Sequence, residues 1–127
     1  MTLVDSSKYI SWMRAGRSPV TMLAQSLRTR SLVSCGIIRI EVLRGIVRKK
    51  VHAELTALFD AIPQIAIDDG IVRDATETAW RLDRKGRVLP VTDLLIAACA
   101  QRVGAVIVTE DPHFKHIPGI TVRTDMQ

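Results

Sequence analysis

Four acidic residues lie at positions from which a folded chain could bring their side chains together. Asp5 directly follows a short apolar run, and Asp111 lies just after a second one. Asp93 falls early in a long apolar segment, and Glu41 precedes Gly45 by one helical turn, where the missing side chain would leave room beside the carboxylate. Carboxylates gathered at one point repel each other, so such a cluster requires a cation or a charged partner. Oxygen ligands of this kind suit Mg²⁺ or Mn²⁺.

Each acid also has an ordinary structural explanation, which the residues alone leave open. Asp5 and Asp93 are typical of helix caps or first helical turns. Glu41 could pair with an arginine one turn further along its helix, and Asp111 precedes a proline, as turn residues often do. Residues 68–69 are also acidic and also follow an apolar run, so a place after a strand does not by itself select the acids of a site.

Short β-type runs alternate with longer helical patterns along the chain. Strands are expected at residues 3–4, 32–35, 65–67, 105–108 and 121–122, and helices at about 9–16, 18–29, 37–49, 52–61, 68–85 and 91–103. The last of these helices is apolar on nearly all sides, which is typical of a buried helix. Strands separated by helices predict right-handed crossovers and a mostly parallel sheet of four or five strands. With helices on both faces of the sheet, the expected fold class is a three-layer α/β/α domain.

A parallel sheet explains how distant acids could meet. In open parallel sheets, ligands bind beyond the carboxyl ends of the strands. Asp5 and Asp111 both follow predicted strands, so we expect them near the same edge. The dipole at the start of a helix favours an ionised carboxylate at Asp93. We therefore expect acids from four separate elements to converge on one edge of the sheet.

Length and composition restrict the class of protein. The chain has 127 residues, of which 47% are hydrophobic and 24% are charged, as expected for a single domain over residues 1–127. Cys35 and Cys99 do not have the spacing of a disulfide scaffold or a zinc site, so reduced thiols and a cytoplasmic location are expected. The longest purely apolar run, Leu94–Ala100, is far shorter than the roughly 20 residues that cross a bilayer, so no membrane association is expected.

The formal net charge of +5 is unevenly distributed along the chain. Residues 1–51 contain ten basic and two acidic residues, whereas residues 52–127 contain eight basic and eleven acidic ones. A basic half is typical of a protein that binds a polyanion such as nucleic acid, although Lys and Arg on solvated helix surfaces would give the same balance. The two acids in this basic half are Asp5 and Glu41, which both belong to the candidate cluster.

Four segments form a recognisable series of motifs. They are Leu3–Ser7, Ile38–Gly45, Leu89–Ala98 and Thr109–Phe114, the last followed by Ile117–Ile120. In order and spacing they resemble the motifs of the PIN domains and, within that family, of the VapC-type toxins of bacterial toxin–antitoxin pairs. The first two motifs are weak alone, but the third and fourth together are specific. The resemblance extends over the whole chain and implies the PIN fold.

The resemblance implies that Asp5, Glu41, Asp93 and Asp111 form an acidic quartet that holds Mg²⁺ or Mn²⁺. Mg²⁺ takes only one or two carboxylates directly, so Asp5 and Asp93 are the expected direct ligands. Glu41 and Asp111 are then expected to act through water or to hold a second ion.

The resemblance also implies two hydroxyl groups near the site, from Ser6 and Thr109. One departure concerns the fourth motif, where an aspartate often stands two residues after the acid of the quartet, and where this chain has His113. This histidine could change how water or RNA is held at that edge. Glu110 is the alternative to Asp111 as the acid of this motif, although the spacing from Thr109 favours Asp111.

The implied activity is that of a metal-dependent endoribonuclease, in which an ion activates water and offsets the charge that builds on the phosphate. The same resemblance implies an RNA substrate, a cognate VapB-type antitoxin and a homodimer. An antitoxin would place an apolar segment in a groove and a basic side chain in the acidic site, and the apolar helix near 37–47 supports this indirectly. Contacts to RNA phosphates are expected from basic residues near the motifs, namely Arg14, Arg17, Arg84, Lys85 and Arg87.

Other interpretations remain open from the sequence. A catalytically silent PIN-like module would use its basic half to hold RNA or a protein without cleaving it. A phosphoacceptor receiver domain also carries acids at strand ends, but it requires a lysine just beyond the last core strand, and Lys115 lies too far along. His113 and His116 are three residues apart, but without a third soft ligand nearby we expect an exposed loop pair instead of a metal site.

Overall fold

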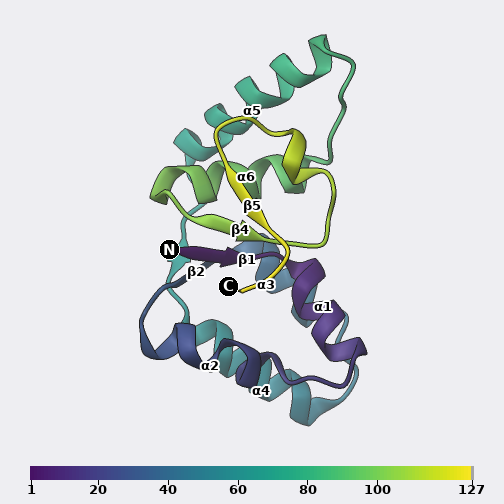
Figure 1. The fold of residues 1–127 in the computed structure, drawn as a ribbon, viewed down its shortest axis with the longest axis vertical. Helices are drawn as coiled ribbons and strands as arrows, with labels where there is room; N and C mark the ends of the chain where they lie inside the picture. Colours follow the sequence, from purple (N-terminus) through teal and green to yellow (C-terminus); the bar gives the residue numbers. More distant parts are fainter. Residues whose placement is uncertain (127) are drawn as a thin grey trace.

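Five short strands form the central sheet of the computed structural model, which describes residues 1–126 (Figure 1). They are β1 (Thr2–Val4), β2 (Leu32–Cys35), β3 (Gln64–Ile65), β4 (Val106–Val108) and β5 (Thr121–Arg123). The strand order is β3-β2-β1-β4-β5, and all four pairings between these neighbours are parallel. Parallel neighbours need crossover connections, which helices provide here.

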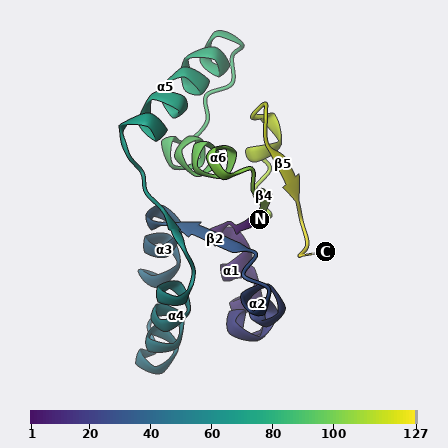
Figure 2. The same ribbon diagram turned by 90° about the vertical axis from the view of Figure 1, so that its left-hand side faces the viewer.

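Helices cover both faces of this sheet. They are α1 (Ser6–Arg14), α2 (Pro19–Arg28), α3 (Gly36–Leu43), α4 (Lys49–Ala61), α5 (Asp69–Arg84), α6 (Val91–Val103) and the short 3₁₀ helix η1 (Phe114–His116). Figure 2 shows α5 and α6 on one side of the sheet and α1 to α4 on the other. The predicted three-layer α/β/α class with a parallel sheet is confirmed.

Strands β1 and β4 bring two residues of the site to one edge of the sheet. Val4 pairs with Val108, and both side chains are buried. Directly beyond them stand Asp5 and Thr109, at the carboxyl ends of the two strands. The backbone N–H of Asp5 donates to the carbonyl oxygen of Val108 at 2.9 Å. The hydrogen-bonded ladder therefore extends as far as the first acid of the quartet.

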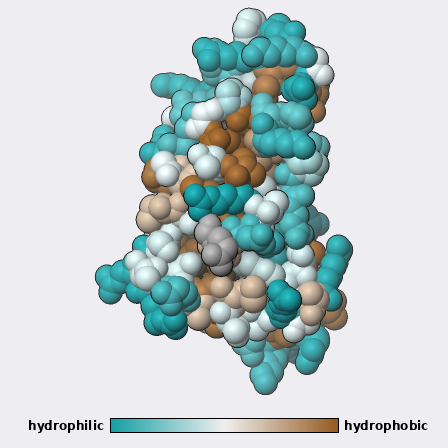
Figure 3. All heavy atoms as spheres, viewed as in Figure 1, coloured by the Kyte–Doolittle hydropathy of each residue, from teal (hydrophilic) through white to brown (hydrophobic). Residues whose placement is uncertain are grey.

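Helix α6 lies inside the molecule because most of its side chains are apolar. Leu94, Ile96 and Cys99 are among its buried residues. Helix α5 packs outside it and buries only a narrow face that includes Ile71 and Leu82. Hydrophilic side chains cover the end of the molecule formed by α5 in the view of Figure 3. Because α6 is held by the core, its first turn has a well-defined position at the sheet edge.

Several predicted boundaries are wrong. The first helix, expected from about residue 9, begins at Ser6. The helix expected over 37–49 ends at Leu43 because the chain turns at Gly45, and glycine is about 1 kcal/mol less favourable than alanine inside a helix. Helix α4 begins at Lys49 instead of 52, since lysines are good helix formers. Strand β3 covers Gln64–Ile65 instead of 65–67, because the chain turns to the N-cap of α5 at Asp68.

The two cysteines lie in the core. Cys35 ends β2 and Cys99 lies in α6, and both are buried free thiols, as the sequence predicts. Within residues 1–126, no helix is both long and apolar enough to cross a membrane.

Replacing Ile96 with alanine should destabilise the protein strongly, because this side chain of α6 is fully buried. We expect the free energy of unfolding in urea to fall by about 2–5 kcal/mol. Val91→Ala is the matched control, because Val91 belongs to the same helix and is 70% exposed. Its effect should stay within about 0.5 kcal/mol. Equal losses in the two variants would contradict the burial of α6.

Candidate active site

Asp5 occupies the N-cap position of α1, but its carboxylate does not cap the helix. Oδ2 of Asp5 instead accepts hydrogen bonds from the hydroxyl of Ser7 at 2.7 Å and from the hydroxyl of Thr109 at 2.8 Å. The residue is buried, with 3% of its surface exposed. Two hydroxyls from different elements therefore set the direction of this carboxylate, which the helix-cap explanation does not account for.

Glu41 lies in α3 and reaches the start of α1. Its Oε1 accepts a hydrogen bond from the hydroxyl of Ser6 at 3.1 Å, so the first predicted hydroxyl supports this acid. At Gly45, the nearest neighbour of an added Cβ would be the carbonyl oxygen of Val42 at 3.9 Å. Glu41 and Gly45 line the same groove. The predicted space beside the carboxylate is therefore present.

Asp93 and Asp111 meet at His113. Nδ1 of His113 lies 3.0 Å from Oδ2 of Asp93 and 3.1 Å from Oδ1 of Asp111. The backbone N–H of His113 also donates to Oδ1 of Asp111 at 2.9 Å. Asp111 is held in turn because its own N–H donates to the hydroxyl of Thr109 at 2.9 Å. The first turn of α6 and the loop after β4 are thus joined through one imidazole ring.

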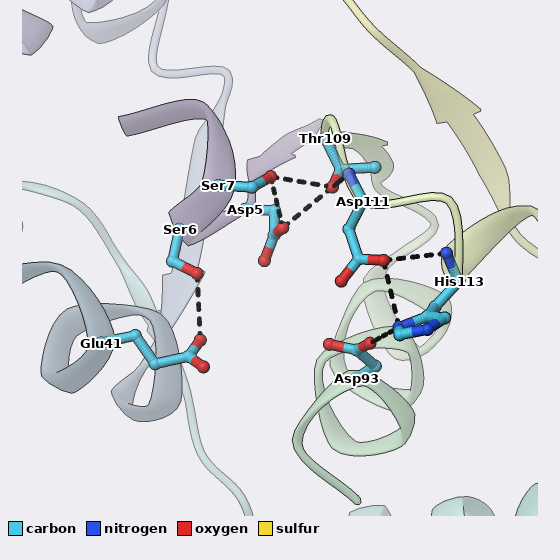
Figure 4. Close-up of polar contacts among 8 residues, drawn as sticks. All are labelled: Asp5, Ser6, Ser7, Glu41, Asp93, Thr109, Asp111 and His113. Carbon is cyan, nitrogen blue, oxygen red and sulfur yellow. Dashed lines mark hydrogen bonds and ion pairs between the residues drawn. The ribbon is translucent and has the colours of Figure 1, made fainter. Parts of the chain in front are cut away.

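The four carboxylates point toward a common space, as predicted (Figure 4). Burial raises the pKa of Asp93 to about 6, and the negative charges of Asp111 and Asp5 contribute to the rise. Burial also raises the pKa of Glu41, with contributions from the charges of Asp5 and Asp111. The ionised quartet is therefore unfavourable by itself, and a cation in its midst would remove that penalty.

The donor atoms fit a divalent cation. Ligand atoms of Asp93, Asp111 and His113 all lie within 4.8 Å of one another, close enough for one ion to contact all three. Carboxylate oxygens suit Mg²⁺ and Mn²⁺, and an imidazole nitrogen also suits transition ions. Asp5 stays a predicted direct ligand. Asp111 was expected to act through water or to hold a second ion, but it contacts the same histidine as Asp93.

Two side chains at the site were not assigned these roles from the sequence. Ser7 donates to Asp5, and its hydroxyl accepts from the backbone N–H of Glu110 at 3.1 Å. In the sequence, the available indication of this role was that Ser7 is a second serine after Asp5. His113 and His116 do not act as a pair, because each ring contacts a different partner, although the side chain of His113 is 45% exposed. The signal for His113 was its place two residues after an acid of the quartet.

Other acids near the motifs point elsewhere. Glu110, the alternative to Asp111, pairs with Lys8 at 3.5 Å and faces α1. Asp68 caps α5 and contacts Arg102 at 2.7 Å. The hydrogen bond from this guanidinium lowers the pKa of Asp68 to about 2. Asp68 therefore has a structural role as a helix cap. Of the two acids in the fourth motif, Asp111 is the one that lies beside the other three acids of the quartet.

Five basic residues were expected to contact RNA, namely Arg14, Arg17, Arg84, Lys85 and Arg87. Arg14, at the end of α1, and Arg17, in the connection after it, are exposed and line the groove that contains Glu41. The other three lie at the end of α5 and in the loop after it, at the end of the molecule opposite α2 and α4 (Figure 1). Nη1 of Arg87 lies 3.0 Å from Nδ1 of His116, so this arginine is close to the loop after the fourth motif. The structure therefore divides the five into two separate groups.

The sequence matches known proteins over almost its whole length. Residues 2–120 match the family model described as PIN domain. The chain belongs to the PIN-domain family. This PIN domain is 32% identical over 126 residues to Ribonuclease VapC11 of Mycobacterium tuberculosis, a match that covers 95% of the chain and 94% of the relative. It is 28% identical over 122 residues to Ribonuclease VapC19 of the same organism, covering 94% of the chain and 97% of the relative.

Solved structures share the same fold. The DNA-bound VapBC structure from Salmonella typhimurium matches this PIN domain with a TM-score of 0.79 at 21% identity, covering 97% of the chain and 98% of the neighbour. The family model and the two relatives confirm the resemblance to VapC-type PIN domains drawn from the four motifs. A receiver domain is excluded as the fold.

The raised pKa of Asp93 predicts that removing its charge stabilises the metal-free protein at neutral pH. Folded Asp93 titrates at about 6, above the ordinary value of 3.8. The folded chain thus binds the proton more tightly, and its stability declines as the pH rises between these values. Asp93→Asn cannot ionise, so it should exceed the wild type by about 1–2 kcal/mol at a pH of about 7.5, and the difference should vanish below about pH 4.

Urea denaturation in EDTA at both pH values measures this difference. Asp69→Asn is the matched control, because Asp69 is an exposed acid in the first turn of α5, whereas Asp93 lies in the first turn of α6. The control should show no gain in stability at neutral pH. A wild type that is more stable than Asp93→Asn at pH 7.5 would contradict the electrostatic account of the cluster.

Proposed function

We propose that this chain is a metal-dependent endoribonuclease that acts as the toxin of a toxin–antitoxin pair. The observation that carries the proposal is the convergence of Asp5, Glu41, Asp93 and Asp111 from four separate parts of the chain. The relatives VapC11 and VapC19 are named ribonucleases, which supports the reaction class. A structural neighbour from Klebsiella pneumoniae is described as a toxin–antitoxin complex, which supports the biological role.

The proposed cofactor is Mg²⁺ or Mn²⁺. When bound, a divalent ion polarises phosphate oxygens and lowers the pKa of a coordinated water, which are the two requirements of phosphodiester hydrolysis. Asp5, Asp93 and Asp111 are the residues that would hold it, and Glu41 would act through water or hold a second ion. Burial and the repulsion between these acids support this choice, because a doubly charged ion would neutralise Asp93 and Glu41, whose pKa values the fold has raised.

The surrounding hydroxyls give the carboxylates their orientation. Ser7 and Thr109 hold one oxygen of Asp5, and Ser6 holds one oxygen of Glu41. Orientation matters because a displacement of about 1 Å at a reacting centre can cost on the order of 100-fold in rate. We infer that these hydroxyls position the acids and take no part in bond breaking themselves.

RNA would approach this negative site along basic surfaces. Arg14 and Arg17 line the groove that also contains Glu41, and Arg87 lies near the loop after the fourth motif. Such residues bind phosphates and orient a strand without reading its bases. The strongly basic first half of the sequence thus has a proposed role, which is to offset the repulsion between RNA and the acids.

Purified protein should cleave total cellular RNA only when Mg²⁺ or Mn²⁺ is present. Asp93→Asn and Asp5→Asn should each lower the cleavage rate by at least about 100-fold, because each removes a carboxylate that we assign to the ion. Denaturing gels and mapping of the cleaved ends measure the reaction. Circular dichroism checks that both variants keep the wild-type fold.

Asp69→Asn is the control here as well and should cleave at the wild-type rate, since Asp69 belongs to the exposed start of α5. Cleavage in EDTA, or full activity of Asp93→Asn, would contradict the proposal. Salt-sensitive RNA binding without cleavage under any metal would instead support the catalytically silent module.

The proposed partner is a VapB-type antitoxin. Its proposed binding site is a groove on the helical layer formed by α1, α3 and α4. The groove has a volume of about 670 Å³ and contains apolar side chains from these elements, including Met13, Val42 and Leu55. Glu41 also lines it, so the groove leads to the acidic cluster. An apolar segment of the antitoxin would fill it, and a basic side chain would reach the acids. A homodimer is also proposed, and Ile40 on α3, which is 62% exposed, is available for such a contact.

Val47→Asp should weaken the complex with the co-expressed antitoxin by at least about 10-fold, because a charge would be buried in an apolar contact. Val47 lines the groove and is 94% exposed, so the free toxin should fold normally. Val72→Asp on α5 is the matched control, since Val72 is 47% exposed and belongs to the opposite helical layer. Calorimetry measures both affinities. If Val47→Asp binds the antitoxin as tightly as the wild type does, the groove is not the antitoxin-binding site.

A further inference from the structure

The histidine of the fourth motif has an unusual position among the acids. Nδ1 of His113 faces carboxylate oxygens from two separate elements, at 3.0 Å from Asp93 and 3.1 Å from Asp111. A neutral imidazole carries a single hydrogen, which one Nδ1–H can direct at only one of two oxygens at a time. A hydrogen bond from Nδ1 therefore accounts for only one of these two contacts, although Oδ1 of Asp111 also accepts from the backbone N–H of His113 at 2.9 Å.

The same distances agree with three ligands around one cation. Ions of this class bind oxygen or nitrogen at about 2.0–2.2 Å, and two ligands at right angles around such an ion lie about 3 Å apart. The two nitrogen–oxygen distances have this value, and the three ligand atoms all lie within 4.8 Å of one another. The backbone N–H of His113 also donates to Oδ1 of Asp111, which fixes the main chain of this residue beside that carboxylate. An ion could thus replace the shared hydrogen with little movement of the side chains.

The nitrogen also bears on which ion is bound. Mg²⁺ prefers a set of oxygen ligands, whereas an imidazole nitrogen favours divalent transition ions. We propose that His113 is a direct metal ligand and that it makes this site select Mn²⁺ or another divalent transition ion over Mg²⁺. This inference rests on the proposed metal-dependent nuclease and names the ligand that decides its ion. An aspartate at this position would give an all-oxygen site and remove the preference.

Pulsed electron paramagnetic resonance of Mn²⁺ added to the metal-free protein tests the assignment directly. A bound nitrogen produces ¹⁴N modulation, so the signal reports ligation without any measurement of activity. Wild type should show this modulation, and His113→Asp should lose it while still binding Mn²⁺. Competition between Mn²⁺ and Mg²⁺ should show a preference for Mn²⁺ that falls by at least about 10-fold in His113→Asp.

His116→Gln is the matched control, because this second histidine contacts Arg87 and not the quartet. It should keep both the modulation and the preference for Mn²⁺. Mn²⁺ bound to wild type without ¹⁴N modulation, or a preference unchanged in His113→Asp, would overturn the role of His113 and leave the nuclease proposal standing. Wild type that binds neither ion would overturn the metal site as a whole, and with it the proposed metal-dependent function.

Discussion

Repulsion between carboxylates at one edge of the sheet is the constraint on which the rest of this structure depends. Asp5, Glu41, Asp93 and Asp111 come from separate parts of the chain, and the fold holds them together although burial and like charges raise the pKa of Glu41 and Asp93. Such an arrangement lowers the stability of the folded chain near neutral pH. Perturbed carboxylates of this kind are concentrated at functional sites, where an ion or a substrate offsets the penalty.

The apolar core makes this arrangement possible. Asp5 follows the buried Val4, Glu41 precedes the buried Val42, and Asp93 precedes the buried Leu94. Each of these acids is therefore attached to a stretch of backbone that close packing keeps in place. Asp111 lies in a loop, where hydrogen bonds with Thr109 and His113 keep it in place instead of close packing. A change in the core would move the acids as well, so stability and activity are linked through the same elements.

Sequence reasoning predicted the layers and the parallel sheet, because apolar periodicity is a strong local signal. The third and fourth motifs indicated Asp93 and Asp111, whereas Asp5 and Glu41 lie in motifs that are weak alone. Sequence reasoning placed the end of α3 and the start of α4 wrongly, since Ile46 continues the apolar stripe past the turn at Gly45. The contacts of His113 could not be predicted, because they depend on where α6 and the loop after β4 meet in space. The spacing from Thr109 favoured Asp111 over Glu110, and in the structure Glu110 turns toward Lys8.

A crystal structure with Mn²⁺, recorded with anomalous scattering, tests the central claim most directly. If the quartet exists to hold a cation, an anomalous peak should lie between the carboxylates of Asp5, Asp93 and Asp111, within bonding distance of at least two of them. Saturating Mn²⁺ with no peak at this edge of the sheet, or with peaks confined to other surfaces, would contradict the account.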